Sequence, residues 1–276
     1  VSRFFGREMS VAALRAQQEC LASYDKEGFV SPLQALRPDE VEAALASYKR
    51  LEETHMSQNS NETGATAHQM HHAWMPWLRD LAKHPAILDA VCAVFQTKNV
   101  YLYNSQLFIR SPGESQTSGT GVVWHVDKAS SRFEPMDRRH FVTAFLALSK
   151  CDHEHGCVCL RPTSTGDIGD RSRECDIPLE AGEFALIGPS TPHVGGLNQS
   201  GEKRYCVALR YIRGSTRDVR TEELGKESLL LVSGKAKATF ESMREVPGEA
   251  TEEGRLLRNS LLTKRRMECW LKLCVE

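Results

Sequence analysis

The spacing of apolar residues divides the chain into three parts. In residues 1–98 the apolar positions recur at helical spacing, and Arg37-Pro38-Asp39-Glu40 is a typical helix start. Between residues 99 and 214 the pattern changes to short β-type runs separated by turn residues. Residues 215–276 return to helical spacing, and an amphipathic helix is expected after Pro247-Gly248. The pattern predicts a single domain, residues 1–276, in which helices from both ends wrap a β core.

The β-type runs of the central part decide the expected fold class. About seven short strands with turns between them predict a β-sandwich or a barrel. The runs that carry this prediction are VYLYNSQLFIR, GVVWHVD, HFVTAFLALS, CVCLRP, GEFALIG and RYCVALRYI.

Composition narrows the range of partners. The 276 residues are 41% hydrophobic and 26% charged, as in ordinary globular proteins, and 35 basic residues balance 36 acidic ones. We therefore expect neither nucleic acid nor a membrane as a partner. The chain has no long apolar run and its first residues lack an apolar signal core, which predicts a cytoplasmic protein. Nine irregularly spaced cysteines predict reduced thiols.

Three residues form a candidate metal site. His125 and Asp127 are two positions apart on an expected strand, so their side chains should point to the same face. His193, at the end of the turn GPSTPH, is the best candidate for a third ligand. Two histidines and one carboxylate leave coordination positions open, which is the arrangement that suits Fe(II) in oxygen chemistry. An isolated His-x-Asp pair is also common by chance, so the triad needs further support.

Arg204 provides that support. It stands eleven residues after His193, at the start of the apolar run RYCVALRYI, and shares a strand face with the smaller Cys206 and Ala208. An unpaired buried charge costs several kcal/mol, so an arginine entering a buried face needs an anion. A dicarboxylate that chelates the metal through one end would supply this anion through its other end.

These residues lie within a longer resemblance. From about Trp74 to Tyr211 the chain resembles the phytanoyl-CoA dioxygenase family of iron- and 2-oxoglutarate-dependent oxygenases, and the order and spacing of the matching segments are specific. The segment YDKEGFVSPLQALRPDEVEAAL is similar to the family's opening helix. The other matching segments are LAKHPAILDAV, SQLFIRSPG, WHVD, VTAFLALSKCDHEHGCVCLRP and LEAGEFALIGPSTPHVGGLNQSGEKRYCVALRY.

The resemblance implies a double-stranded β-helix (a jelly-roll, cupin-like fold) and an enzyme that uses Fe(II), 2-oxoglutarate and O2, releasing succinate and CO2. Carried over position by position, it implies that His125, Asp127 and His193 bind the iron. It also implies that Arg204 holds the distal carboxylate of 2-oxoglutarate. Gln106 matches a strand where the family often places a residue near the co-substrate.

Other polar residues are expected around the same site. Asn104, Gln106 and Arg110 share one face of a strand, which indicates a polar cavity there, unless the strand is an edge facing water. Thr143 is expected to line the co-substrate pocket. The candidate substrate-binding residues are Asn104, Arg110, Lys128 and Trp74.

The expected reaction is oxidation of an unactivated C–H bond in a small polar metabolite bearing a carboxylate or phosphonate, ending in a hydroxyl group, a ring or a double bond. An acyl-CoA substrate is the alternative within the family, and a non-enzymatic metal-binding β-domain is the alternative outside it. The presence of Asp127 argues against halogenation, because family halogenases carry a small residue there. The family's Pro-Gly-Ser-His run is replaced by Pro162-Thr163-Ser164-Thr165, which affects the loop above the site.

A second metal site is conceivable in the run from Cys151 to Cys159. Cysteine and histidine alternate there and would share one face of a continuous strand, as the ligands of a zinc site do. However, Asp152, Glu154 and Gly156 indicate a turn that interrupts the strand.

Overall fold

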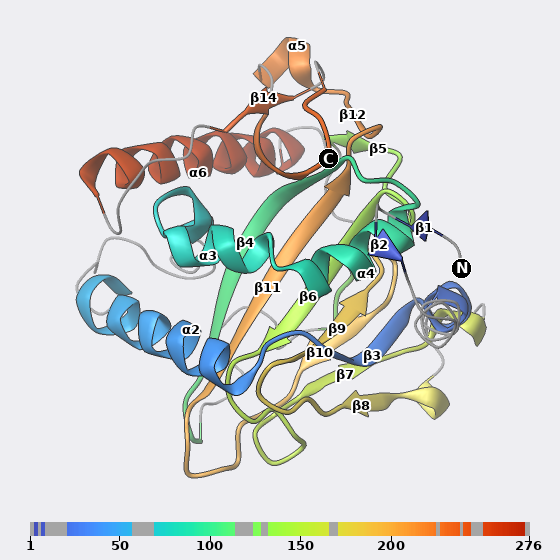
Figure 1. The fold of residues 1–276 in the computed structure, drawn as a ribbon, viewed down its shortest axis with the longest axis vertical. Helices are drawn as coiled ribbons and strands as arrows, with labels where there is room; N and C mark the ends of the chain where they lie inside the picture. Colours follow the sequence, from blue (N-terminus) through green and yellow to red (C-terminus); the bar gives the residue numbers. More distant parts are fainter. Residues whose placement is uncertain are drawn as a thin grey trace.

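The described residues form two β-sheets that face each other, with helices packed on the outer side of the larger sheet (Figure 1). The computed structural model describes residues 3–4, 7–8, 21–56, 69–113, 124–127, 132–165, 171–224, 227–237, 240–243 and 251–273. The larger sheet has seven strands in the order β14 (Glu241–Ser242), β13 (Ser228–Ser233), β4 (Val100–Arg110), β11 (Arg204–Arg213), β6 (Phe141–Ala147), β9 (Glu183–Ile187) and β3 (Phe29–Gln34). The smaller sheet has the order β10 (His193–Gly195), β7 (Val158–Leu160) and β8 (Cys175–Ile177).

This arrangement confirms the predicted double-stranded β-helix. The sheet order ends at β14 and β3, so the large sheet is open rather than closed into a barrel. Two short ribbons lie outside it, formed by β1 (Arg3–Phe4) with β2 (Arg7–Glu8) and by β5 (Phe133–Glu134) with β12 (Arg217–Asp218).

Three of the helices begin at a proline. Pro38, Pro76 and Pro85 stand in the first turn of their helices, where the missing N–H of proline leaves no hydrogen bond unmade. The predicted start at Arg37-Pro38-Asp39-Glu40 is therefore confirmed. The helical segments are residues 21–27, α2 (Pro38–Leu51), η1 (Glu52–Met56), η3 (His71–Ala73), α3 (Pro76–Ala82), α4 (Pro85–Phe95), η4 (Thr163–Thr165), η5 (Arg171–Arg173), α5 (Thr221–Leu224) and α6 (Glu252–Leu273). No helix in the described parts of the chain has both the length and the apolar character needed to cross a membrane.

The central strand β11 shows how the sequence builds both faces of the large sheet. Tyr205, Val207 and Leu209 join the core beneath the helices, whereas Cys206 and Ala208 join the core between the two sheets. Side chains alternate between the two faces of a strand, so every second residue of β11 points into the space between the sheets. This face also carries Arg204 and Arg210, and it positions the site described below.

Two expectations about the flanking parts were wrong in detail. Residues 29–34, within the part expected to be helical, form the edge strand β3, which pairs with β9. This strand contains Pro32, which an edge position tolerates because one side of the strand needs no partner. Residues 228–233, also expected to be helical, form β13 and pair with β4. The run SLLLVS is apolar throughout, and such a run does not distinguish a strand from a buried helix.

Candidate functional site

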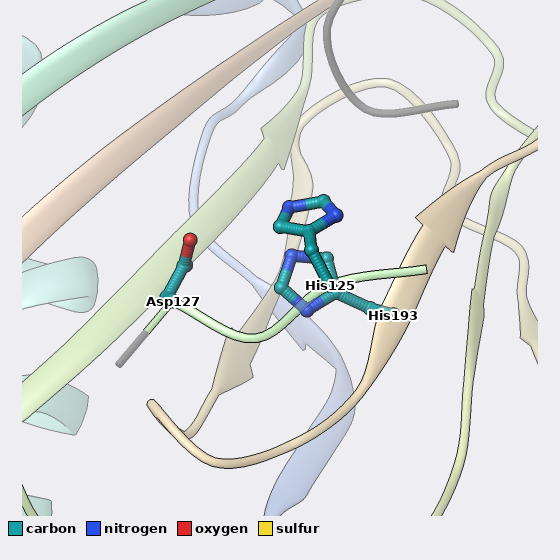
Figure 2. Close-up of side chains that lie close together, drawn as sticks. All are labelled: His125, Asp127 and His193. Atoms are coloured by element: carbon teal, nitrogen blue, oxygen red, sulfur yellow. The ribbon is translucent and has the colours of Figure 1, made fainter. Parts of the chain in front are cut away.

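The three predicted metal ligands come together between the two sheets. One ligand atom each from His125, Asp127 and His193 lies within 4.8 Å of the others, and Figure 2 shows the three side chains grouped together. The backbones of the two histidines are joined by a pair of hydrogen bonds, His125 N–H to His193 O (3.1 Å) and His193 N–H to His125 O (2.9 Å). In the described part of the chain His125 thus sits on an isolated bridge rather than on the regular strand that was expected.

His193 is held in a form that can bind a metal. Its Nδ1 lies 2.9 Å from the carbonyl oxygen of Thr191, so Nδ1 carries the proton and Nε2 keeps a free lone pair. Burial lowers the pKa of His193 more than the nearby Asp127 carboxylate raises it. The imidazole is therefore neutral at physiological pH, as a metal ligand has to be.

The carboxylate of Asp127 is held at both oxygens. Thr143 donates its hydroxyl to Oδ2 at 2.6 Å, and the guanidinium of Arg210 lies 3.3 Å from Oδ1. Burial alone would raise the pKa of Asp127, but Arg210, His193 and Thr143 together hold it well below its usual range. The carboxyl group is therefore ionised and oriented before any metal arrives.

A cavity of about 440 Å³ opens beside the triad. This volume lies within the range of pockets that hold small ligands. Its apolar wall includes Phe108 and Phe145, whose ring centroids are 5.9 Å apart. Of the described lining residues, three are arginines and only Asp127 is acidic, so the cavity has an excess of positive charge. An anionic ligand would offset this excess.

Arg204 and Arg110 form the cationic end of this cavity. Arg204 is 1% exposed, Arg110 is 6% exposed, and the two residues face each other in the register of β11 with β4. Among the described residues no carboxylate lies within ion-pair distance of Arg204, and its Nε makes no hydrogen bond. The guanidinium of Arg204 is therefore buried without a carboxylate partner among the described residues, as expected if a bound dicarboxylate supplies the anion.

Gly156 supplies one hydrogen-bond partner of Arg204. The Nη1 of Arg204 donates to the carbonyl oxygen of Gly156. Gly156 has a φ of 72°, and a Cβ at this position would lie 2.6 Å from the carbonyl oxygen of Gly196 and from the carbonyl carbon of Leu197. Only glycine fits at this position of the turn that interrupts the Cys151–Cys159 run. Because the carbonyl of Gly156 accepts from Arg204, the same turn also positions the guanidinium.

Arg210 is a charged site residue that the sequence analysis missed. It lines the cavity, pairs with Asp127 and donates through Nη1 to Gln106 Oε1 at 2.9 Å. The signal was present, because counting every second residue from Arg204 through Cys206 and Ala208 reaches position 210. The partner of that side chain was not readable, since Asp127 lies 83 residues earlier.

The remaining predicted residues occupy different places. Gln106, Thr143 and Arg110 line the cavity. Asn104 is buried and donates to the side chain of Gln69, a lining residue that the sequence analysis did not single out, at 3.5 Å. Trp74 is 2% exposed and lies in the main core, outside the cavity lining, with its Nε1 bonded to His71. Lys128 lies outside the described residues.

Within the described part of the chain, the alternating Cys151–Cys159 run does not gather into a metal-binding cluster. Across the residues that the structure describes, the triad of His125, Asp127 and His193 is the only cluster with metal-binding geometry. Within the run, His153 pairs with Asp176 and His155 pairs with Asp152, both through Nδ1. The expected turn is present, because the chain bends at residues 152–156, between the bridge residue Cys151 and strand β7.

Several solved structures share this fold. A non-heme monooxygenase, ThoJ in a nickel complex, is 25% identical, with a TM-score of 0.76 and coverage of 91% of this chain and 98% of the other. The non-heme alpha-ketoglutarate-dependent epimerase SnoN from nogalamycin biosynthesis is 20% identical, with a TM-score of 0.62 and coverage of 85% and 97%. CytC3 with Fe(II) and alpha-ketoglutarate is 19% identical, with a TM-score of 0.64 and coverage of 84% and 97%.

A comparison with protein families gives the closer assignment, whereas no curated protein matches the sequence. The family described as phytanoyl-CoA dioxygenase (PhyH) matches residues 24–206, which is more than half of the chain. The matched region contains the triad, Arg110, Thr143 and Arg204. The sequence and the site geometry therefore agree, and the chain belongs to the phytanoyl-CoA dioxygenase family of iron- and 2-oxoglutarate-dependent oxygenases.

Proposed function

We propose that the chain oxidises a C–H bond of a small polar molecule at an iron bound by His125, Asp127 and His193. The observation that carries this proposal is that the triad and two buried arginines line one cavity. Family membership sets aside the alternative of a non-enzymatic metal-binding domain. Hydroxylation, ring closure and desaturation all begin with removal of the same kind of hydrogen atom, so they share this site.

The ligand set fits iron(II). Two imidazole nitrogens and one carboxylate oxygen on one side of an ion leave its other side open, as oxygen-activating iron requires. When bound, iron(II) and 2-oxoglutarate would activate O2, the oxidant that breaks an unactivated C–H bond, while 2-oxoglutarate is itself oxidised to succinate and CO2. The protein's own part is to orient the ligands, through Thr191 on His193 and through Thr143 and Arg210 on Asp127.

The cationic end of the cavity fits the distal carboxylate of 2-oxoglutarate. Arg204 is buried, without a carboxylate partner among the described residues, and directly opposite Arg110. A guanidinium pairs with a carboxylate through two parallel hydrogen bonds, which places the bound molecule as well as holding it. Phe108 and Phe145 give the same cavity an apolar lining, which suits the carbon chain of the co-substrate. Gln106, whose Oε1 is occupied by Arg210, offers its amide N–H groups to the co-substrate.

The prediction that the substrate carries a carboxylate or phosphonate group has less support from the structure than from the sequence. That expectation rested on Arg110 and Lys128, among others. Arg110 lies beside Arg204, at the end of the cavity assigned to the co-substrate, and Lys128 lies outside the described residues. We therefore propose a small polar substrate without requiring an anionic group. Gln69, which pairs with Gln106 and also lines the cavity, is a candidate polar contact for this substrate.

The proposal is tested in two stages. Anaerobic addition of Fe(II) and then 2-oxoglutarate should produce the weak visible absorption band of a chelated keto acid in the wild type but not in His193→Ala. Succinate release is then measured with a panel of small polar metabolites and one acyl-CoA thioester, which covers the alternative within the family. Absence of the band in well-folded wild-type protein would rule out the proposed co-substrate.

A further inference from the structure

Arg210 connects two residues of the site that are far apart in the sequence. Its Nη2 lies 3.3 Å from Asp127 Oδ1, and its Nη1 lies 2.9 Å from Gln106 Oε1. The arginine side chain is 13% exposed and the aspartate side chain 8% exposed, so water screens this pair little. In the register of the sheet Arg210 faces Thr143 on one side and Asn104 on the other.

Each oxygen of the Asp127 carboxylate has its own anchor. Thr143 donates to Oδ2 and Arg210 donates to Oδ1, from neighbouring positions of β6 and β11. A carboxylate oxygen has more than one lone pair, so one oxygen can keep its anchor and still bind a metal. Binding one metal through both oxygens would need a free lone pair of each oxygen to face the metal while Thr143 and Arg210 keep the hydrogen bonds that they donate, which is a narrower geometric requirement than binding through one oxygen.

The arginine itself is held in place by Gln106. This glutamine is 5% exposed, and its Oε1 accepts from the second nitrogen of the same guanidinium. A guanidinium is planar and presents its donors in a rigid fork, so fixing one nitrogen also fixes the direction of the other. A lysine at this position would keep the charge but would lose the fork.

We propose that Arg210 is a positioning residue that restricts Asp127 to binding iron through one oxygen. The restriction keeps a coordination position open for the keto acid. This inference rests on the proposed function, because it concerns the same iron site. The simpler role for Arg210 is to neutralise a buried carboxylate, and that role depends on charge rather than on the fork.

Arg210→Met and Arg210→Lys separate the two roles, with Arg213→Met as a control on the same strand, outside the cavity lining. Two affinities are measured by anaerobic titration of each variant: that for Fe(II), and, at saturating Fe(II), that for the keto acid. The keto acids are 2-oxoglutarate and pyruvate, which chelates in the same way but lacks the distal carboxylate.

Arg210→Met is expected to weaken the binding of 2-oxoglutarate and pyruvate by the same factor, about 10- to 100-fold, as the loss of a charge-assisted hydrogen bond to Asp127 would predict. Fe(II) affinity should stay within a few-fold of the wild type, because the freed carboxylate can still bind. Arg210→Lys should show a smaller loss that is again equal for both keto acids, and Arg213→Met should match the wild type.

Three results would overturn the proposal. Unchanged binding of both keto acids in Arg210→Met would mean that Arg210 does not influence the open position. A loss for 2-oxoglutarate alone would mean that Arg210 contacts the distal carboxylate. Full recovery in Arg210→Lys would mean that only charge matters. If Arg210→Met does not fold, Arg210→Lys carries the test alone, and if the wild type binds neither keto acid, the proposed function fails instead.

Discussion

Arg110 and Arg204 lie directly opposite each other on the neighbouring strands β4 and β11, and both side chains are buried at the edge of one cavity. Two guanidinium groups in this position repel each other, and Arg204 has no carboxylate partner among the described residues, although burying a charge without one costs several kcal/mol. The pair is therefore stabilised when an anion occupies the cavity. This relationship explains why the cavity has one strongly cationic end while its middle is apolar.

The first prediction concerns the arginine pair. Arg204→Met should weaken 2-oxoglutarate binding by roughly 10- to 150-fold, the equivalent of a charge-assisted hydrogen bond worth about 1.5–3 kcal/mol. Arg110→Met should have a smaller effect, because Arg204 remains. Fe(II) affinity should be nearly unchanged in both, as neither residue contacts the triad. Anaerobic calorimetry checks this, and iron loss in Arg204→Met would indicate a structural role instead.

Thr143 provides the second prediction. Thr143→Val keeps the shape of the side chain but removes the hydroxyl that donates to Asp127 Oδ2 at 2.6 Å. We expect keto acid binding to weaken about 10-fold or more, because the freed carboxylate oxygen competes for the metal. Thr143→Ser retains the hydroxyl and should behave like the wild type. Equal behaviour of the valine and serine variants would show that the hydroxyl has no part in orienting Asp127.

Gly156 provides the third prediction, with Gly113 as its control. Both residues have positive φ, but a Cβ at Gly113 meets no atom within 4 Å, whereas one at Gly156 meets backbone at 2.6 Å. Gly113→Ala should cost about 1 kcal/mol of unfolding free energy for the backbone conformation alone. Gly156→Ala should cost roughly 1–3 kcal/mol more, as overpacking does.

The Gly156→Ala variant should also bind 2-oxoglutarate more weakly, since the carbonyl of Gly156 holds Arg204. Urea unfolding gives the two free energies, and titration with 2-oxoglutarate gives the affinity. The interpretation of Gly156 would be wrong if both alanine variants lost the same stability.

The fourth prediction concerns a buried ion cluster away from the site. Arg132 is 1% exposed and pairs with the fully buried carboxylates of Asp218 (2.8 Å) and Glu227 (3.0 Å). Arg132→Met should lower the unfolding free energy by about 3–5 kcal/mol, because two buried carboxylates lose their counterion. Arg217→Met breaks an exposed pair with Glu134 and should cost about 0–1 kcal/mol. A small loss in Arg132→Met would show that the cluster adjusts, for example by protonation.

Much of the β core was predictable because its pattern is local. The strands β4, β6, β7, β9 and β11 all appear where short β-type runs ended in turn residues. The strands β3 and β13 were not predictable in this way. The first carries a proline and the second is apolar throughout, so each became a strand only through pairing at or near the edge of the sheet.

The residues of the candidate site also fall into those that a local pattern predicted and those that depended on strand pairing. Sequence spacing alone determined the pairing of His125 with Asp127 on one side of the chain, and the position of Arg204 at the start of a buried strand. The position of Arg204 depends on the two-residue period that any strand imposes. His125 and Asp127 come together although His125 sits on an isolated bridge rather than on a regular strand.

Only the tertiary structure decided that Arg210 pairs with Asp127, that Arg110 faces Arg204 and that Trp74 lies in the core away from the cavity. Each of these facts depends on which strands become neighbours and in what register. Register is set by the burial of whole faces across the sheet, and that is a property of the folded chain rather than of any one segment.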